Sequence, residues 1–334
     1  MTAVFSRAPD PGLLGLQRRL RAVAPDASAV TEGEFVLESA ASAKETPRLV
    51  RAPLIEGGAM RARRVPGDPL MAFAAFLDGT QASRIVAYAD GRPVVHGTVA
   101  AVIRERRNRR LATWHRPIVA RRLYAPLRLL SADWERALQS LDIPLVDTTP
   151  APSSAGDSPH PFVLRDIAIH QVQADRERAE HELAERWCRH ENAPLFIDGS
   201  ISGSERVAEA ECAVGVVKSH GTLYSEGDAL LTIFRLRRGE RSSVFRITSP
   251  KRTPVASWYL RVRDPAGHDP MWGLVRVEVA ETKRVDEPAV VGTRADEVSR
   301  WIFGEAAPLA LPDSRWDKMV YGIRDCEEFL RAVT

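Results

Sequence analysis

Two apolar stretches of this chain each end in an Asp-Gly-(Ser/Thr) turn. The first, at 72–80, reads AFAAFLDGT, and the second, at 193–200, reads APLFIDGS. A short apolar run followed by a turn is typical of a strand that is buried on both faces of a sheet. One such turn alone more often marks an Asp that caps the backbone. Two of them predict that Asp78 and Asp198 lie at the ends of neighbouring buried strands.

The pattern around these stretches predicts an α/β fold. After the strand at 71–78, apolar runs at 84–89 and 93–104 flank Asp90-Gly91, which favours a hairpin and gives three consecutive antiparallel strands. A helix over 169–189 leads directly into the strand before Asp198. This order is that of a ribonuclease H-like mixed β-sheet flanked by helices, with the first and fourth strands side by side. Further predicted strands are 212–218, 243–248, 255–263 and 273–280, and further helices are 131–141, 293–303 and 313–333.

The domain organisation is less regular at the amino end. Residues 1–69 are interpreted as an extension of loops plus a basic amphipathic helix at 13–24, which either packs on the core or binds a partner. Residues 70–334 form the main domain, with a C-terminal extension. The Pro/Ser-rich segment 147–161 has no periodicity and is predicted to be a flexible insertion.

A third carboxylate is expected on the helix at 169–189. Glu180 precedes Leu183 and Ala184 by three and four residues, so it lies on the apolar face, where a charge is costly unless it meets a cation or donors. Its alternative role is an ion pair with Arg176 on the same face. Glu177, on the flank of the apolar stripe, is the reserve candidate. Together with Asp78 and Asp198, Glu180 would suit two Mn²⁺ or Mg²⁺ ions for phosphodiester hydrolysis.

Composition excludes several classes of protein. The three cysteines are far apart and form no CxxC pair, so neither a disulfide framework nor a thiolate zinc site is indicated. Without a signal-peptide pattern or an apolar run of about 18 residues, a cytoplasmic location is expected. No GxxxxGK(S/T) motif occurs, so any ATPase motor must be another chain. A guide-dependent PIWI-like nuclease would need a longer chain.

Arginine is concentrated locally although the net charge is only +3. The segment 104–110, RERRNRR, is either a solvated turn or a rim that contacts phosphates. The strand at 255–263 would place Tyr259, Arg261 and Arg263 on one face, which is either a DNA track or a solvated edge. The DNA-binding candidates are Arg104, Arg106, Arg107, Arg109, Arg110, Tyr259, Arg261 and Arg263.

These motifs, taken with the segment VGVVKS at 214–219, resemble the NurA family of nucleases. The shared features are an early Asp-Gly-(Ser/Thr), a helix Glu, a second Asp-Gly-Ser and a following Gly-x-x-Lys-(Ser/Thr). Segments 257–263, 274–278 and 313–321 also lie where later NurA-like strands and the closing segment are expected. The resemblance covers roughly residues 70–330.

The resemblance implies a manganese-dependent nuclease with 5′–3′ exonuclease and single-strand endonuclease activity. It also implies a homodimer that works with a hexameric HerA-type ATPase on DNA ends, in DNA repair and end resection or in defence against foreign DNA. Asp78, Glu180 and Asp198 match the family's metal ligands. Lys218 matches a lysine that holds the scissile phosphate, although a lysine at a strand end is commonly just exposed.

The chain departs from the family at its carboxyl end. The family closes its site with a late histidine, whereas this chain has Tyr321-Gly322 and no histidine after His268. The substitutes for that ligand would be Asp313, Asp325, Glu327 or Glu328. The missing histidine also leaves open an alternative function, a catalytically silent ribonuclease H-like subunit that binds nucleic acid or an ATPase partner.

Overall fold

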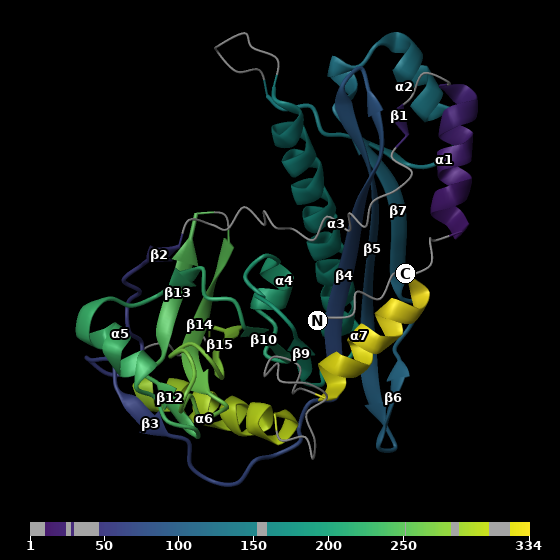
Figure 1. Cartoon of the computed structure of the whole chain (residues 1–334). Coiled ribbons are helices and arrows are strands. Elements are labelled where there is room, and N and C mark those ends of the chain that lie inside the picture. Colours follow the sequence, from purple (N-terminus) through teal and green to yellow (C-terminus); the bar gives the residue numbers. More distant parts are fainter. Residues whose placement is uncertain are drawn as a thin grey trace.

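The computed structural model describes residues 11–24, 28–29, 47–151, 159–250, 252–281, 287–306 and 321–334 of the 334-residue chain (Figure 1). These residues form a mixed sheet of 13 strands, whose main path runs β3-β12-β14-β15-β10-β9-β4-β5-β7-β8. Its strands are β1 (Ser28–Ala29), β3 (Ala62–Arg64), β4 (Ala75–Ala89), β5 (Arg92–Arg107), β6 (Arg110–Thr113), β7 (Ile118–Ala125), β8 (Leu145–Asp147), β9 (Leu195–Ile197), β10 (Ala213–Val217), β12 (Glu240–Ser242), β13 (Phe245–Ser249), β14 (Arg252–Arg261) and β15 (Leu274–Ala280). The short strands β2 (Arg48–Leu49) and β11 (Thr222–Leu223) pair separately.

Helices cover both faces of this sheet. One face packs against α3 and α4 through a core that includes Leu77, Leu183 and Ile197. The opposite face packs against α6 and α7 through Phe76, Phe196 and their neighbours. The helices are α1 (Pro11–Val23), η1 (Leu127–Leu129), α2 (Ala132–Gln139), α3 (Pro161–His190), α4 (Glu205–Ala208), α5 (Gly227–Phe234), α6 (Pro288–Glu305) and α7 (Tyr321–Val333). Within the described ranges, no helix has the length and apolar character that crossing a bilayer requires.

At the centre of the sheet, the strand that carries Asp78 and the strand that leads into Asp198 are adjacent, as predicted. β4 pairs in parallel with β9, with Phe76 opposite Phe196 and Leu77 opposite Ile197. β9 pairs in parallel with β10, while β5 is antiparallel to both β4 and β7. The chain is therefore α/β, with a mixed sheet between helices.

One local prediction is wrong, because the runs at 71–78 and 84–89 are a single strand. β4 begins at Ala75 and continues through Asp78 to Ala89, since β5 offers partners along almost its whole length. Asp78 therefore lies inside a strand and not at its end. The hairpin at Asp90-Gly91 is confirmed, and both residues have the positive φ, 49° and 74°, that such a turn needs.

The amino-terminal helix is packed on the core. Leu16 and Leu20 of α1 join a cluster with Val86 of β4 and Leu138 of α2 at one end of the long hairpin. Of the insertion predicted at 147–161, residues 152–158 lie outside the described residues, as do 313–320 of the last predicted helix. The helix predicted at 169–189 extends over 161–190, with Pro161 in its first turn and His160 as its cap.

Candidate active site

Asp78 and Asp198 lie side by side on parallel strands. The N–H of Asp198 donates to the carbonyl oxygen of Leu77 at 3.1 Å, which continues the β4–β9 ladder by one residue past Ile197. Because side chains alternate along a strand, Asp78 points to the same face as Phe76, and Asp198 to the same face as Phe196. That face is the one covered by α7. Both carboxylates therefore share one side of the sheet.

Lys218 joins them from the next strand. It directly follows β10, and its Nζ donates to Oδ2 of Asp198 at 2.7 Å. The lysine and aspartate side chains are only 18% and 19% exposed. Lys218 is therefore an ion-pair partner of Asp198, unlike the common exposed lysine at a strand end.

Glu180 approaches the same place from α3, on the other face. Its carboxylate lies directly over Gly79, where any Cβ would collide with it. Gly79 and Asp78 point to opposite faces of β4, so Glu180 and Asp78 flank one strand from two sides. Glu180 forms the expected ion pair with Arg176, whose Nε also donates to Gln81 at 3.1 Å.

Burial dominates the electrostatics of Asp78 and Glu180. Burial raises the pKa of Asp78 well above its usual range, and the charges of Asp198 and Glu180 raise it further, against a smaller lowering by Lys218. Burial also raises the pKa of Glu180 to about 7, although Arg176 opposes this shift. Uncompensated negative charge of this kind is favourable only beside an additional cation or a bound proton.

The acids do not yet converge on one point. Across the described part of the chain, no three His, Cys, Asp or Glu side chains are arranged to hold a common metal ion. Asp78 and Asp198 occupy the α7 face, whereas Glu180 remains on the α3 face with Arg176. Bringing Glu180 to the other two would require it to leave Arg176.

The remaining ligand candidates are engaged elsewhere or not described. Glu177 accepts a hydrogen bond from Gln173 Nε2 at 3.0 Å. On α7, Asp325 pairs with Arg104, Glu327 lies 3.5 Å from Arg331, and Glu328 lies 2.9 Å from Arg324. Asp313 lies outside the described residues.

The proposed DNA track on β14 is buried. Tyr259 and Arg261 are each 0% exposed. The guanidinium of Arg261 donates to the carbonyl oxygens of Leu236, Trp272 and Phe234, which fixes surrounding loops. Arg263, just past the strand, is half-buried. In this structure Tyr259 and Arg261 have no surface with which to contact DNA, because β14 is covered on both faces.

The arginine-rich segment 104–110 divides into two sets. Arg104 pairs with Asp325, and Arg106 donates to Glu305 at 2.8 Å and 3.0 Å, so both hold the sheet to the helices behind it. Arg107, Arg109 and Arg110 are exposed. Only this second set is placed to contact a large ligand.

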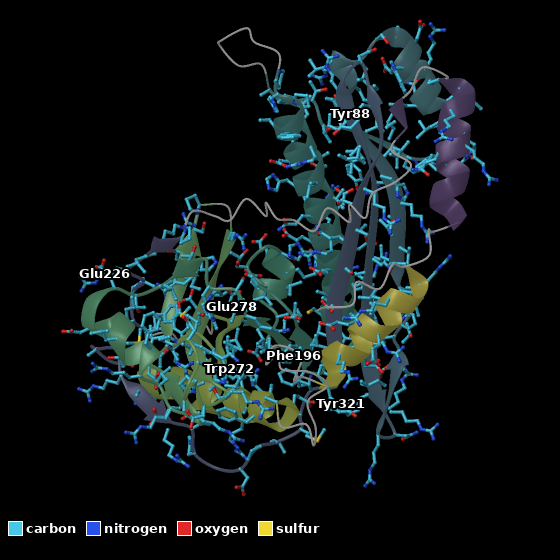
Figure 2. The ribbon with its side chains drawn as sticks, viewed as in Figure 1. Tyr88, Phe196, Glu226, Trp272, Glu278 and Tyr321 are labelled. Atoms are coloured by element: carbon cyan, nitrogen blue, oxygen red, sulfur yellow. The ribbon has the colours of Figure 1, made fainter. Side chains whose placement is uncertain are left out.

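Sequence reasoning missed the residue that fixes the turn after Asp198. Oε2 of Glu278 accepts from Ser200 Oγ at 2.7 Å and from Ile201 N–H at 3.0 Å. Glu278 is in the interior (Figure 2) and is paired with Arg276 two residues earlier on β15. The alternation of charges within the apolar sequence LVRVEVA at 274–280 was the available signal, since charges on a buried strand need dedicated partners.

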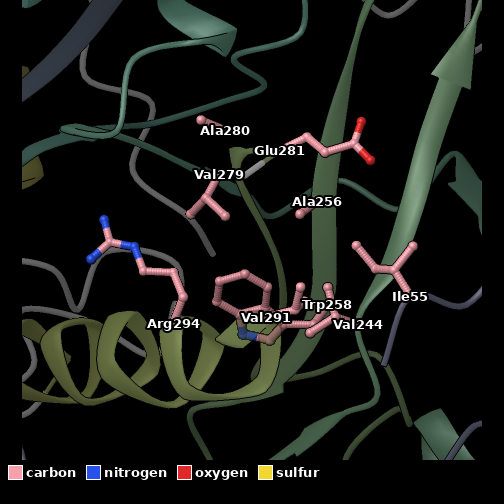
Figure 3. A pocket seen from close by; sticks show the side chains of 9 residues that line it. All are labelled: Ile55, Val244, Ala256, Trp258, Val279, Ala280, Glu281, Val291 and Arg294. Atoms are coloured by element: carbon pink, nitrogen blue, oxygen red, sulfur yellow. The ribbon is translucent and has the colours of Figure 1, made fainter. Parts of the chain in front are cut away.

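Two cavities lie away from these acids. A small apolar pocket of about 10 Å³ between β14, β15 and α6 is lined by Trp258, Val291 and their neighbours (Figure 3), and it holds no more than a water molecule. An open groove of about 760 Å³ lies between residues 51–60 and 224–229. The candidate site therefore lies on β4 and just past the ends of β9 and β10, and not in these two cavities. No protein-family model matches the chain, and a search of curated proteins also finds no match.

Proposed function

We propose that this chain is a divalent-metal-dependent DNA nuclease with a ribonuclease H-like fold, similar to the NurA family. The observation that carries the proposal is the pair of carboxylates Asp78 and Asp198 on the adjacent parallel strands β4 and β9. Lys218, which follows β10, is bound to Asp198. Acids and a lysine at neighbouring strand positions are the groups that phosphodiester hydrolysis uses.

The strand order supports the fold assignment. Five strands lie in the spatial order β7-β5-β4-β9-β10. In chain order, β4, β5 and β7 are antiparallel neighbours, β9 then lies parallel beside β4, and β10 lies parallel beside β9. A helix, α3, precedes the fourth strand and covers one face. That is the order expected of a ribonuclease H-like sheet.

The donor set fits a hard divalent cation. Asp78, Asp198 and Glu180 offer only oxygen ligands, which Mn²⁺ and Mg²⁺ prefer. Burial and the charges of Asp198 and Glu180 raise the pKa of Asp78, and a bound cation would favour its ionised form. Asp78 and Asp198 would hold the ion, and Glu180 would leave its ion pair with Arg176 and bind the ion as well. A bound ion would supply Lewis acidity and a water of lowered pKa, and a second ion would fit the same chemistry.

The chain's own residues then have separate roles. Lys218 binds Asp198 in the absence of substrate and would turn to a non-bridging oxygen of the scissile phosphate. Arg176 positions Glu180. Glu278, through Ser200 and Ile201, holds the turn that sets the direction of Asp198. The site therefore has a rigid side on β9 and an exchangeable one on α3.

The resemblance extends the proposal to substrate and partners. The substrate is a DNA end, cut by 5′–3′ exonuclease and single-strand endonuclease activity, in repair or in defence against foreign DNA in the cytoplasm. The partners are a second copy of the chain and a hexameric HerA-type ATPase that feeds the DNA. The absence of a Walker A motif in the sequence supports the need for a separate motor.

The test is degradation of end-labelled linear duplex and single-stranded DNA with Mn²⁺, Mg²⁺ or EDTA, with and without the ATPase. Asp198→Ala is compared with Asp133→Ala, which changes an acid that is 87% exposed on α2. Cleavage that needs metal, disappears in the first variant and persists in the second supports the nuclease. Absence of cleavage by the wild type under all conditions refutes it.

A second candidate function is a silent subunit that binds nucleic acid or the ATPase. The observation that favours it is that cations already occupy two acids, Lys218 at Asp198 and Arg176 at Glu180. Wild-type protein that binds DNA or the ATPase but cuts nothing would establish this role instead.

A further inference from the structure

The turn of the β5–β6 hairpin has an unfavourable residue at its tip. Arg107 and Arg110 form its last cross-strand pair, so Asn108 and Arg109 are the two turn residues. Both have positive φ, 50° and 63°. Two-residue hairpin turns of this kind favour Asn-Gly, because only glycine adopts positive φ at the second position without steric cost. Here arginine takes the place of glycine.

The closing pair breaks a second rule. Arg107 and Arg110 are directly opposite one another, and like charges at such positions repel. Glu105 accepts a hydrogen bond from Arg107 at 2.7 Å and so relieves part of this repulsion. Within the described residues, no acceptor is found for the side chain of Arg109 or Arg110. The tip thus concentrates three guanidinium groups at a local cost in stability.

The hairpin is also placed to meet a large ligand. Residues 107–110 are all exposed, and Figure 1 shows the hairpin extending past α7 at one end of the sheet. Arg107 is five residues along β5 from Val102, the partner of Asp78, which corresponds to about 17 Å along the strand. That separation equals on the order of five base-pair steps of duplex DNA.

We propose that the β5–β6 hairpin is a DNA-binding arm, in which Arg107, Arg109 and Arg110 contact the phosphate backbone of duplex DNA beside the acids. Strained backbone and unfavourable charge are retained where a ligand uses them. A two-stranded ribbon has the width to lie along or in the major groove. The contacts are to phosphates and carry no base preference. The inference rests on the proposed function only in taking DNA as the polyanion.

The geometry makes an unusual combination of effects testable. Arg109→Gly creates the favoured Asn-Gly turn and removes one cation, so it should weaken DNA binding without lowering stability. One lost phosphate contact reduces the slope of log K against log salt by about 0.9 and weakens binding about eightfold at about 0.1 M salt. Arg109→Gln keeps the strained backbone and should weaken binding equally. Adding Arg110→Gln to Arg109→Gly should double the loss in slope.

The experiment is a salt series of fluorescence anisotropy with a labelled blunt duplex and EDTA, so that cleavage does not interfere. Arg238→Gln is the matched control, because Arg238 is an exposed arginine beside β12, toward the other end of the sheet. Urea unfolding of each variant reports stability. A midpoint for Arg109→Gly equal to or above that of the wild type, with the reduced slope, supports the arm.

Other outcomes separate the arm from the nuclease. A slope that is unchanged in Arg109→Gly, or lowered equally in Arg238→Gln, overturns the arm even if the wild type cleaves DNA. Failure of the wild type to bind duplex at low salt, or a loss confined to single strands, also overturns it. Reduced slope in a protein that never cleaves DNA leaves the arm and removes the nuclease.

Discussion

Helix α3 carries two acids that face the sheet in opposite electrostatic surroundings. Asp175 is 3% exposed, and Glu180 follows it five residues later. Burial raises the pKa of Asp175, but hydrogen bonds from Tyr124, Gln171 and Arg122 outweigh it and lower the pKa below its usual value. For Glu180, burial prevails and the pKa rises to about 7. The same helix therefore holds one acid whose partners outweigh its burial, Asp175, and one whose partner Arg176 does not, Glu180.

The difference comes from the strands opposite. Asp175 faces β7, which supplies Arg122 and the hydroxyl of Tyr124 at 2.8 Å. Glu180 faces Gly79 of β4, which supplies no donor side chain and stands next to Asp78. Compensated acids stabilise a fold, whereas acids held near one another without enough cations are typical of sites that bind a proton or a metal.

The largest expected effect follows from neutralising Asp78. Asp78→Asn should lower cleavage by about 10³-fold or more, because losing a charged ligand costs several kcal/mol in the transition state. It should not lower the free energy of unfolding, since the amide removes the repulsion from Asp198 and Glu180. Rates with Mn²⁺ and urea unfolding test both parts. Cleavage within tenfold of the wild type would contradict a role for Asp78.

The next effect is the pH dependence of stability at Glu180. An acid whose pKa is raised on folding binds its proton more tightly in the folded state, so the protein loses stability as pH rises from about 4.5 to about 7. The loss amounts to at most about 3 kcal/mol. Urea unfolding at pH 5 and pH 8 should show it, and Glu180→Gln should flatten the difference. If the free energy of unfolding changed equally between pH 5 and pH 8 in the wild type and in Glu180→Gln, the group with the raised pKa would not be Glu180.

Metal binding should reverse part of that loss. If the uncompensated acids hold Mn²⁺, the ion stabilises the folded protein at pH 8 by about 2.7 kcal/mol at a hundredfold excess over its Kd. The gain should shrink at pH 5, where protons compete for the carboxylates. Thermal unfolding with and without Mn²⁺ measures this directly. Asp175→Asn should keep the stabilisation by Mn²⁺, and Asp198→Asn should lose it. The opposite result would contradict the assignment of the metal to the acids around Asp198.

The smallest effect concerns the compensated acid. Asp175→Asn leaves Arg122 and Arg178 without their carboxylate, and breaking a buried ion pair costs about 3–5 kcal/mol. These two arginines are 34% and 64% exposed, so water replaces part of the interaction and the expected loss is about 2 kcal/mol. Cleavage per folded molecule should stay unchanged. A drop in cleavage at full folding would make Asp175 part of the site.

Local pattern was enough to predict much of the centre of the fold. The apolar runs before Asp78 and Asp198 specify buried strands, and the apolar face of α3 specifies the side on which Glu180 lies. Local pattern gave the wrong result where pairing with a neighbouring strand decides where a strand ends. β5 pairs continuously past the Asp-Gly of β4, and that ladder keeps the turn-like sequence extended.

The same limit explains the arginines. A sequence shows seven residues with five arginines at 104–110, but not which of them meets an acid. Arg104 and Arg106 find Asp325 and Glu305 only because α7 and α6 pack behind β5, about 200 residues later in the chain. Likewise, β14 looks half-exposed by alternation, yet both of its faces are covered in the fold.

By itself, the sequence determined which residues carry charge on buried strands and helices, because hydrophobic periodicity is a local property. The tertiary structure alone decided which charges are compensated. Asp198 meets Lys218, Asp175 meets Arg122 and Tyr124, and Asp78 meets mainly other acids, through contacts between elements brought together by the packing of one sheet. Electrostatic compensation depends on distances of a few ångströms between distant segments, and only the folded chain sets them.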